Sequence, residues 1–230
     1  FEGEFNERDM IINMPLNLTT ADEQAVLNNC TFTVTANNVN ITNIEMNAED
    51  YAPSLILLNK TRNVNIEGNT LSLTNNVPAA TTHTIEVLGG SDNVIRNNII
   101  TTVAEESNVV YNLSTGNMIS FPTTSIHALA SNNIIIDTNL ITTKPKDDTT
   151  EEYGTIYGIF IRGDYDKDSA ITGAQMINNE IITDGEVYAY GVNVDYADDI
   201  TVENNNVTTS GTNYADGIQV YSITGSKFNA

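Results

Sequence analysis

One short pattern of apolar and polar residues returns six times along the sequence with unchanged internal spacing. An aliphatic residue is followed five positions later by a second one, and the residue three positions after the first is usually asparagine. The aliphatic pairs are Ile41/Met46, Ile66/Leu71, Ile95/Ile100, Ile136/Ile141, Ile177/Ile182 and Val202/Val207. Up to a seventh start at Phe228, the copies lie 25, 29, 41, 41, 25 and 26 residues apart. A fixed unit separated by segments of unequal length predicts stacked coils with variable loops.

The polar position inside the pattern is asparagine in four copies, whereas Ile44 and Glu180 depart from it. An asparagine amide can both donate a hydrogen bond to an identical amide one layer away and accept one from it. Asparagine also tolerates the left-handed backbone that a tight turn needs. We therefore expect a stacked ladder at one corner of the coil, made of Asn69, Asn98, Asn139 and Asn205.

A further aliphatic segment precedes each unit at a nearly constant distance. Its central residues Val34, Leu58, Val87, Val194 and Val220 lie 7, 8, 8, 8 and 8 residues before Ile41, Ile66, Ile95, Val202 and Phe228. Each coil then has three strands, which predicts an all-β chain folded as a parallel β-helix. A β-sandwich or a propeller would also have short, Thr-rich strands, but it would not explain one asparagine position repeated in register.

The variable segments are expected to leave the coil mainly between strand three and the next strand one. These loops fall at about residues 73–83, 101–124, 142–156, 183–189 and 208–215, with a further insertion at residues 163–170. Residues 31–230 form the β-helix in this interpretation. Residues 1–30 are a cap or a first coil, and Thr20 and Glu23 have capping-box spacing before a short helix or loop. Because Phe228 begins an unfinished copy, we expect the natural protein to continue.

The asparagine turn and the three-strand coil resemble the right-handed parallel β-helix proteins of the pectate-lyase-like group, over about residues 31–230. The Asn- and Thr-rich style of segments such as "NNVNITN" and "NVIRNNIITT" is most similar to the adhesin-like surface proteins of methanogenic archaea. Bacterial cell-surface β-helix proteins are similar as well. The resemblance implies an extracellular, cell-surface module, and it places the polysaccharide groove of the related enzymes along strand one and its flanking loops.

Composition excludes some partners. The formal net charge of -21 would make a nucleic-acid backbone repel the chain. No apolar run approaches the roughly 20 residues needed to cross a bilayer, so we expect no membrane insertion of this fragment. The single cysteine, Cys30, permits neither an internal disulfide nor a CxxC metal site. We expect a monomer without a cofactor, apart from weakly bound calcium.

Alternation along strand one predicts which side chains face outward. One outward row contains Leu57, Glu86, His127, Phe160, Asn193 and Gln219, and the next contains Asn59, Leu88, Leu129, Arg162, Asp195 and Tyr221. The register at His127 is ambiguous by one residue. Eight of the ten tyrosines lie between Tyr153 and Tyr221, and several of them flank strand one. Aromatic rings beside amides and carboxylates suit sugars. We therefore predict a ligand-binding face made of Phe160, Arg162, Asn193, Asp195, Gln219 and Tyr221.

Catalytic groups are not evident in this register, so we predict no catalytic residue. Glu86 and Asp195 fall about four coils apart, or roughly 19 Å, which is too far for glycoside hydrolysis. Arg162 and Asp195 lie on adjacent coils, and such neighbours more often form an ion pair than a catalytic pair. His127 is a lone histidine in this register. The predicted function is an adhesin that binds an extended glycan or a partner cell. The alternatives are a polysaccharide lyase or glycoside hydrolase of the pectate-lyase-like group, and a structural stalk.

The insertion "GDYDKDSA" carries Asp164, Asp166 and Asp168 in the alternate spacing that calcium loops use. The glycine at the sixth position of such loops is missing, and Gln175 stands where a bidentate glutamate would be needed. A solvated acidic insertion is the more ordinary interpretation. These three aspartates are nevertheless the predicted metal ligands.

Overall fold

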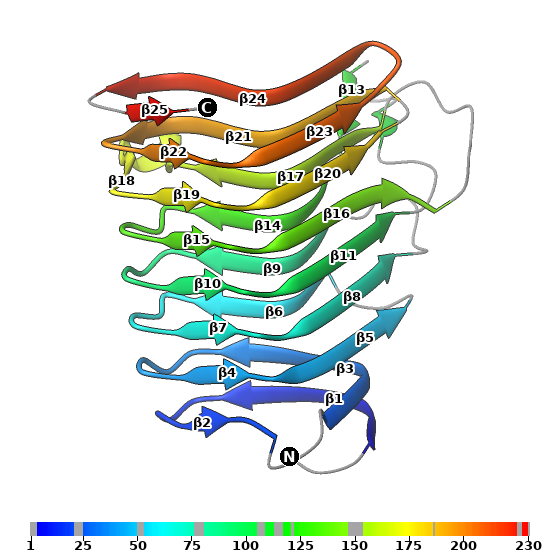
Figure 1. Ribbon diagram of the computed structural model, residues 1–230, viewed down its shortest axis with the longest axis vertical. Helices are drawn as coiled ribbons and strands as arrows, with labels where there is room; N and C mark the ends of the chain where they lie inside the picture. Colours follow the sequence, from blue (N-terminus) through cyan, green and yellow to red (C-terminus); the bar gives the residue numbers. More distant parts are fainter. Residues whose placement is uncertain are drawn as a thin grey trace.

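The computed structural model describes residues 4–20, 25–49, 53–75, 81–104, 109–112, 117–120, 122–146, 154–185, 187–224 and 227–229. The chain is a parallel β-helix with three strands per coil (Figure 1). In Figure 1 the nearer strands β7 and β8 run from left to right, the more distant β6 and β9 run back, and the chain rises from its N-terminus to its C-terminus. This path makes the coil right-handed, as the resemblance implies.

The strands fall into three columns that follow the coil. Strand one of successive coils is β6 (Ser54–Asn59), β9 (Thr82–Leu88), β14 (Thr123–Leu129), β17 (Thr155–Arg162), β21 (Tyr188–Asp198) and β24 (Tyr214–Thr224). Strand two is β2 (Asn17–Leu18), β4 (Asn40–Thr42), β7 (Asn65–Glu67), β10 (Val94–Arg96), β15 (Ile135–Asp137), β19 (Gln175–Ile177), β22 (Thr201–Glu203) and β25 (Lys227–Asn229). Strand three is β5 (Ile44–Glu49), β8 (Thr70–Asn75), β11 (Ile99–Ala104), β16 (Leu140–Pro145), β20 (Glu180–Asp184) and β23 (Asn206–Ser210).

The N-terminal strands continue the same stack. β1 (Glu4–Ile12) pairs in parallel with β3 (Ala25–Val34), and β2 pairs with β4. β3 contacts β5 with its first half and β6 with its last residues, so it joins strand three to strand one. The short helix considered after Thr20 does not extend past residue 24, because the chain from Ala25 is strand, and residues 21–24 lie outside the described ranges.

Three small elements depart from the coil. β12 (Val109–Asn112) and β13 (Asn117–Ser120) form an antiparallel hairpin, and β18 (Ile171–Thr172) pairs with β21. A 3-10 turn, Tyr165–Lys167, lies in the insertion after β17. Within the part of the chain described here, no helix has the length and apolar character needed to cross a membrane.

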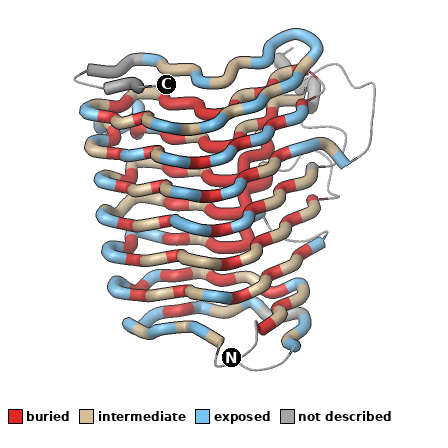
Figure 2. The backbone as a smooth tube through the Cα atoms, in the orientation of Figure 1, coloured by how far each residue is buried: buried red, intermediate tan, exposed pale blue. Residues whose placement is uncertain are grey.

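The core is a set of aliphatic stacks inside the coil. Ile41, Ile66, Ile95, Ile136, Met176 and Val202 are paired in register from coil to coil, and all are buried. Phe228 pairs with Val202, as the sequence spacing predicts. Figure 2 shows buried positions recurring at the same places in successive coils, alternating with exposed ones along each strand. Because each stack places like residues one strand spacing apart, the coil buries a continuous apolar column.

Two of the three corners are tight and use left-handed residues. Between strands two and three the residue with positive φ is Asn43, Gly68, Asn97, Thr138, Asn178 or Asn204. Between strands one and two a second set is Asn38, Asn63, Asp92, Asn133, Gly173 and Asp199. These residue types are enriched because asparagine, aspartate and glycine tolerate this backbone better than others. The ladder asparagines are not among them, so their role is in hydrogen bonding rather than in left-handed backbone geometry.

The asparagine ladder forms at the corner between strands two and three, and it has five members. Each side-chain amide donates to the next oxygen at 2.9–3.0 Å, in the order Asn69, Asn98, Asn139, Asn179 and Asn205. The sequence spacing predicts Glu180 at the fourth place, but Met176 rather than Ile177 pairs with Ile136, and Asn179 therefore enters the ladder. The ladder ends below at Ile44, whose backbone N–H donates to Asn69 Oδ1.

Candidate functional site

The strand-one face has the register that alternation predicts. Backbone pairing places Leu57, Glu86, His127, Phe160, Asn193 and Gln219 in one column, which we call the post-bend column. The terminal column, two residues further along each strand, contains Asn59, Leu88, Leu129, Arg162, Asp195 and Tyr221. The ambiguity at His127 is thereby removed, because it pairs with both Glu86 and Phe160.

A bend in strand one adds another column to this face. In the five coils from β6 to β21 two consecutive residues are buried at the bend: Leu55 and Ile56, Thr84 and Ile85, Ser125 and Ile126, Gly158 and Ile159, Gly191 and Val192. The alternation of side chains therefore shifts by one, and residues three apart contact each other on the same side of the strand. The pre-bend column contains Ser54, His83, Thr124, Tyr157, Tyr190 and Asp216. Its side chains meet those of the post-bend column across the bend.

Aromatic rings fill the bend through the middle coils. His83 and His127 have ring centroids 4.5 Å apart, and His127 lies 5.4 Å from Phe160. Phe160 stacks on Tyr157 at 4.8 Å, and Tyr157 stacks on Tyr190 at 5.1 Å. Burial raises the pKa of Tyr157 to about 12, so its phenol stays protonated near neutral pH. The rings therefore form one continuous stack that runs from coil to coil.

Further along the axis the face becomes polar. The Asn193 amide donates to Gln219 Oε1 at 2.7 Å, and Gln219 Nε2 donates to Asp216 Oδ2 at 3.2 Å. Asn193 itself is buried, so Gln219 and Asp216 present the accessible polar groups of this row. Tyr221 is half exposed, at 51%. The predicted binding residues are thus register neighbours on β17, β21 and β24, and of these Asn193 is buried.

Arg162 and Asp195 are adjacent in the terminal column, but the ion pair that their position suggests is not found among the described residues. Tyr165, from the insertion after β17, intervenes: its hydroxyl donates to Asp195 Oδ1, and its ring lies 5.7 Å from the Arg162 guanidinium carbon. Tyr165 also stacks on Tyr196 with centroids 4.6 Å apart. Arg162 therefore stays exposed above an aromatic ring.

The three aspartates of the insertion differ in their surroundings, and Asp166 is exposed. Asp164 caps the 3-10 turn by accepting from the backbone N–H groups of Asp166 and Lys167, and it also pairs with the Lys167 ammonium. Lys167 thereby lowers the pKa of Asp164. Asp168 accepts a hydrogen bond from the Tyr196 hydroxyl. The three carboxylates are not among the described groups whose possible ligand atoms converge.

Calcium binding at Asp164, Asp166 and Asp168 is accordingly expected to be millimolar or weaker, because a cation would have to displace Lys167 and the backbone donors from Asp164. Calorimetric titration of calcium into the purified protein measures this. Micromolar binding that disappears when all three residues become asparagine would contradict the expectation, whereas heat that survives the triple change would place any calcium elsewhere.

Both histidines of the chain meet Glu86 at the bend, on consecutive coils. His83 Nε2 lies 4.0 Å from Glu86 Oε1, and His127 Nδ1 lies 3.8 Å from the same oxygen. The Ser54 hydroxyl donates to the other oxygen, Oε2, at 2.6 Å. His127 is therefore not a lone histidine. Strict alternation along a strand without a bend would place His83 on the same side as Ile85, inside the core. The sequence pattern therefore does not predict this cluster.

The side chains of the cluster are largely buried, His83 most of all, and their charges influence one another. Burial, together with the neighbouring His127, lowers the pKa of His83 to about 3, so this imidazole is neutral at neutral pH. Burial raises the pKa of Glu86, but His127, the Ser54 hydrogen bond and His83 outweigh it and lower the pKa overall. Glu86 is therefore an anion between two imidazoles. The contacts of 3.8–4.0 Å are too long for hydrogen bonds, and the Nδ1 atoms of both histidines are buried without a partner.

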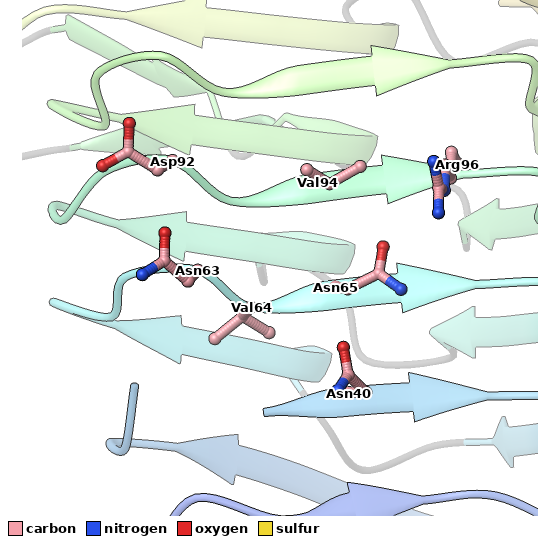
Figure 3. Close-up of a pocket in the computed structure, with 7 residues that line it drawn as sticks. All are labelled: Asn40, Asn63, Val64, Asn65, Asp92, Val94 and Arg96. Atoms are coloured by element: carbon pink, nitrogen blue, oxygen red, sulfur yellow. The ribbon is translucent and has the colours of Figure 1, made fainter. Parts of the chain in front are cut away.

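A shallow depression of about 400 Å³ lies on the strand-two face, over β7 and β10 (Figure 3). It is lined by Asn40, Asn63, Val64, Asn65, Asp92, Val94 and Arg96. Its polar groups are engaged with neighbours: Arg96 pairs with Glu67 at 2.9 Å, Asn65 donates to the same carboxylate, and Asp92 accepts from Asn133. We therefore regard the strand-one face as the better candidate site.

Fold and face together define the chain as a parallel β-helix protein with an asparagine ladder and a polar-aromatic strand-one face. Among solved structures it is similar to an alginate lyase from Paenibacillus sp. str. FPU-7, with 12% identity, a TM-score of 0.37, and coverage of 99% of this chain and 91% of the other. It is also similar to the Streptococcus pneumoniae surface protein and adhesin PfbA, with 10% identity, a TM-score of 0.21, and coverage of 90% and 68%. No family model and no curated protein matches the sequence.

Proposed function

We propose that this domain is an extracellular, cell-surface module that binds an extended glycan along the strand-one face and performs no chemistry on it. We place the ligand over Phe160, Arg162, Asn193, Asp195, Gln219 and Tyr221. Arg162, Asp195, Gln219 and Tyr221 make the contact, whereas the buried Asn193 and the packed Phe160 support the face from below. The observation that carries the proposal is their arrangement: planar polar groups, a guanidinium and an exposed ring lie in two adjacent columns over β17, β21 and β24.

The spacing of the columns suits a chain of sugars. Successive coils are separated by about 4.8 Å, close to the length of one sugar unit, so each unit of a glycan lying along the axis meets a new set of side chains. The half-exposed Tyr221 offers an aromatic surface to the C–H groups of a ring, while Gln219 and Arg162 offer hydrogen bonds to hydroxyl groups. Phe160, whose ring contacts His127 and Tyr157, acts mainly by holding the face in place.

Charge narrows the class of glycan. With a net charge of -21, the chain repels polyanions at long range, and Asp195 and Asp216 place further carboxylates on the face itself. A neutral glycan, such as an unsubstituted hexose polymer, is therefore the expected ligand. A polyuronate, which is the substrate class of the lyase alternative, is disfavoured for the same reason.

A glycan-array screen of the purified domain, followed by calorimetry with the best neutral ligand, tests the proposal. Replacing Tyr221 by alanine is expected to weaken binding about tenfold or more, because an exposed aromatic contact is lost. Phe160→Ala should act in the same direction. The matched control is Ile99→Ala, which also truncates a half-exposed apolar side chain but lies on strand three. It should leave the affinity unchanged.

Other outcomes favour the alternatives. Binding that survives both Phe160→Ala and Tyr221→Ala would place the ligand on another face. Release of reducing or unsaturated sugar ends by the purified domain would establish an enzyme and contradict the proposal. If neither a glycan nor a cell surface binds, a structural stalk becomes the better account.

A further inference from the structure

The cluster at the bend combines the three side chains that most often ligate zinc without sulfur. The candidate ligand atoms of His83, Glu86 and His127 all lie within 4.8 Å of one another. In a tetrahedral site with metal bonds of about 2.0–2.1 Å, ligand atoms lie about 3.3–3.4 Å apart. The contacts of Glu86 with the two imidazoles, 3.8 and 4.0 Å, and the separation of the imidazole nitrogens, at most 4.8 Å, exceed this by about 0.4 to 1.5 Å, so the side chains must close on the metal by small rotations.

The surroundings of the cluster favour a metal ligand over an ordinary polar contact. His127 Nδ1 is directed at Glu86 and is buried, yet it has no hydrogen-bond partner. A buried polar atom left unpaired is costly, and a bound cation would satisfy this nitrogen and the carboxylate oxygen together. Both ligand-bearing strands are interior members of the sheet, so the backbone holds the three side chains in a fixed register.

Ser54 supplies the outer contact that metal sites commonly have. Its hydroxyl donates to Glu86 Oε2, which orients the carboxylate so that Oε1 faces the two imidazoles. Ser54 is therefore a positioning residue. The Glu86 and His127 side chains keep 18% and 13% exposure, so the cluster is not sealed from solvent, and water could complete a four-coordinate shell.

We propose that His83, Glu86 and His127 form a binding site for one divalent first-row transition-metal ion of the zinc type. Two imidazoles and one carboxylate select such ions over calcium, which prefers a shell of six to eight oxygens. The site is distinct from the aspartates of the insertion, and it stands whether or not the face binds a glycan.

Titration of Zn²⁺ into chelator-stripped protein, without a glycan and without an affinity tag, tests the inference. One equivalent is expected to bind. Replacing His83 or His127 by glutamine should lower the affinity about 100-fold or more, since losses of 10–100-fold follow from outer contacts alone. Ser54→Ala is expected to lower it about tenfold. Co²⁺ bound to the same protein should give the intense visible absorption of a four-coordinate ion.

A pair of variants matched in charge separates the site from general attraction to an acidic protein. Glu86→Gln and Asp164→Asn each remove one negative charge, but only Glu86→Gln should abolish stoichiometric Zn²⁺ binding. Circular dichroism of each variant establishes that the coil is intact. If the affinity is the same in the His83→Gln, His127→Gln double variant, or if folded wild-type protein binds no stoichiometric Zn²⁺, the inference is wrong.

Discussion

Replacing Asn139 by leucine is expected to lower the free energy of unfolding by about 3 kcal/mol. The side chain lies in the middle of the ladder, where its oxygen accepts from both the backbone N–H and the amide of Asn98. Its own amide donates to the carbonyl of Ile95 and to Asn179 Oδ1. Leucine has a similar size but leaves these buried groups without partners, and each unsatisfied group costs about 1–3 kcal/mol. Denaturant unfolding followed by circular dichroism measures the change.

The control for this experiment is Asn206→Leu. Asn206 is exposed on β23, directly after the ladder residue Asn205, and the same substitution there should change stability by no more than about 0.5 kcal/mol. A similar loss for both variants would mean that leucine is unfavourable in these strands in general. A loss below about 1 kcal/mol at Asn139 would show that the ladder contributes little.

The metal-free protein is expected to lose about 2–3 kcal/mol of stability between pH 6.5 and pH 4.5 through His83. The unfolded chain binds a proton at this histidine near pH 6.5, whereas burial delays protonation of the folded protein to about pH 3. Between these values the unfolded state holds more protons, so stability falls as the pH falls, by about 1.4 kcal/mol per unit. Above pH 6.5 this contribution is complete and constant.

The comparison variant is His83→Gln, measured in the same chelator-containing buffers. Glutamine does not titrate, so the difference between wild type and variant should shrink with decreasing pH across this window. Glu86, whose folded pKa is lowered, adds a loss in the same direction, but only below its unfolded pKa of about 4.3, outside the window. Parallel stability curves for wild type and variant would show that His83 is protonated in the folded protein.

Much of this fold was predictable because a stack of coils repeats its chemistry in register. The spacing from Leu58 to Ile66 and from Val87 to Ile95 sets the position of strand one relative to strand two, and the structure pairs these residues as predicted. Local ambiguity caused the error at the fourth ladder position. Met176/Ile181 and Ile177/Ile182 are both aliphatic pairs five residues apart, and only the pairing of whole strands decides between them.

The candidate site was predictable only where strict alternation holds. Phe160, Arg162, Asn193 and Asp195 lie after the bend, and their columns follow from a period of two. His83 lies before it, and no residue type marks the bend, which is occupied by leucine, threonine, serine or glycine in different coils. Glu86 on β9 and Asp195 on β21 are separated by three strand spacings, or about 14 Å, whereas the sequence predicted four. Even this shorter distance is too long for the two carboxylates to act together in glycoside hydrolysis.

The unequal length of the coils has a consequence for how such a protein can change. Successive ladder asparagines are separated by 29, 41, 40 and 26 positions, yet the hydrogen bonds between them are uniform. Extra residues enter mainly between strands three and one. The corner between strands two and three keeps its length, and the corner between strands one and two does so except at the insertion after β17. The edge of the molecule between strands three and one therefore tolerates segments of different length. We therefore expect that a foreign peptide grafted between Asn75 and Thr82 can be lengthened without shifting any column of the strand-one face.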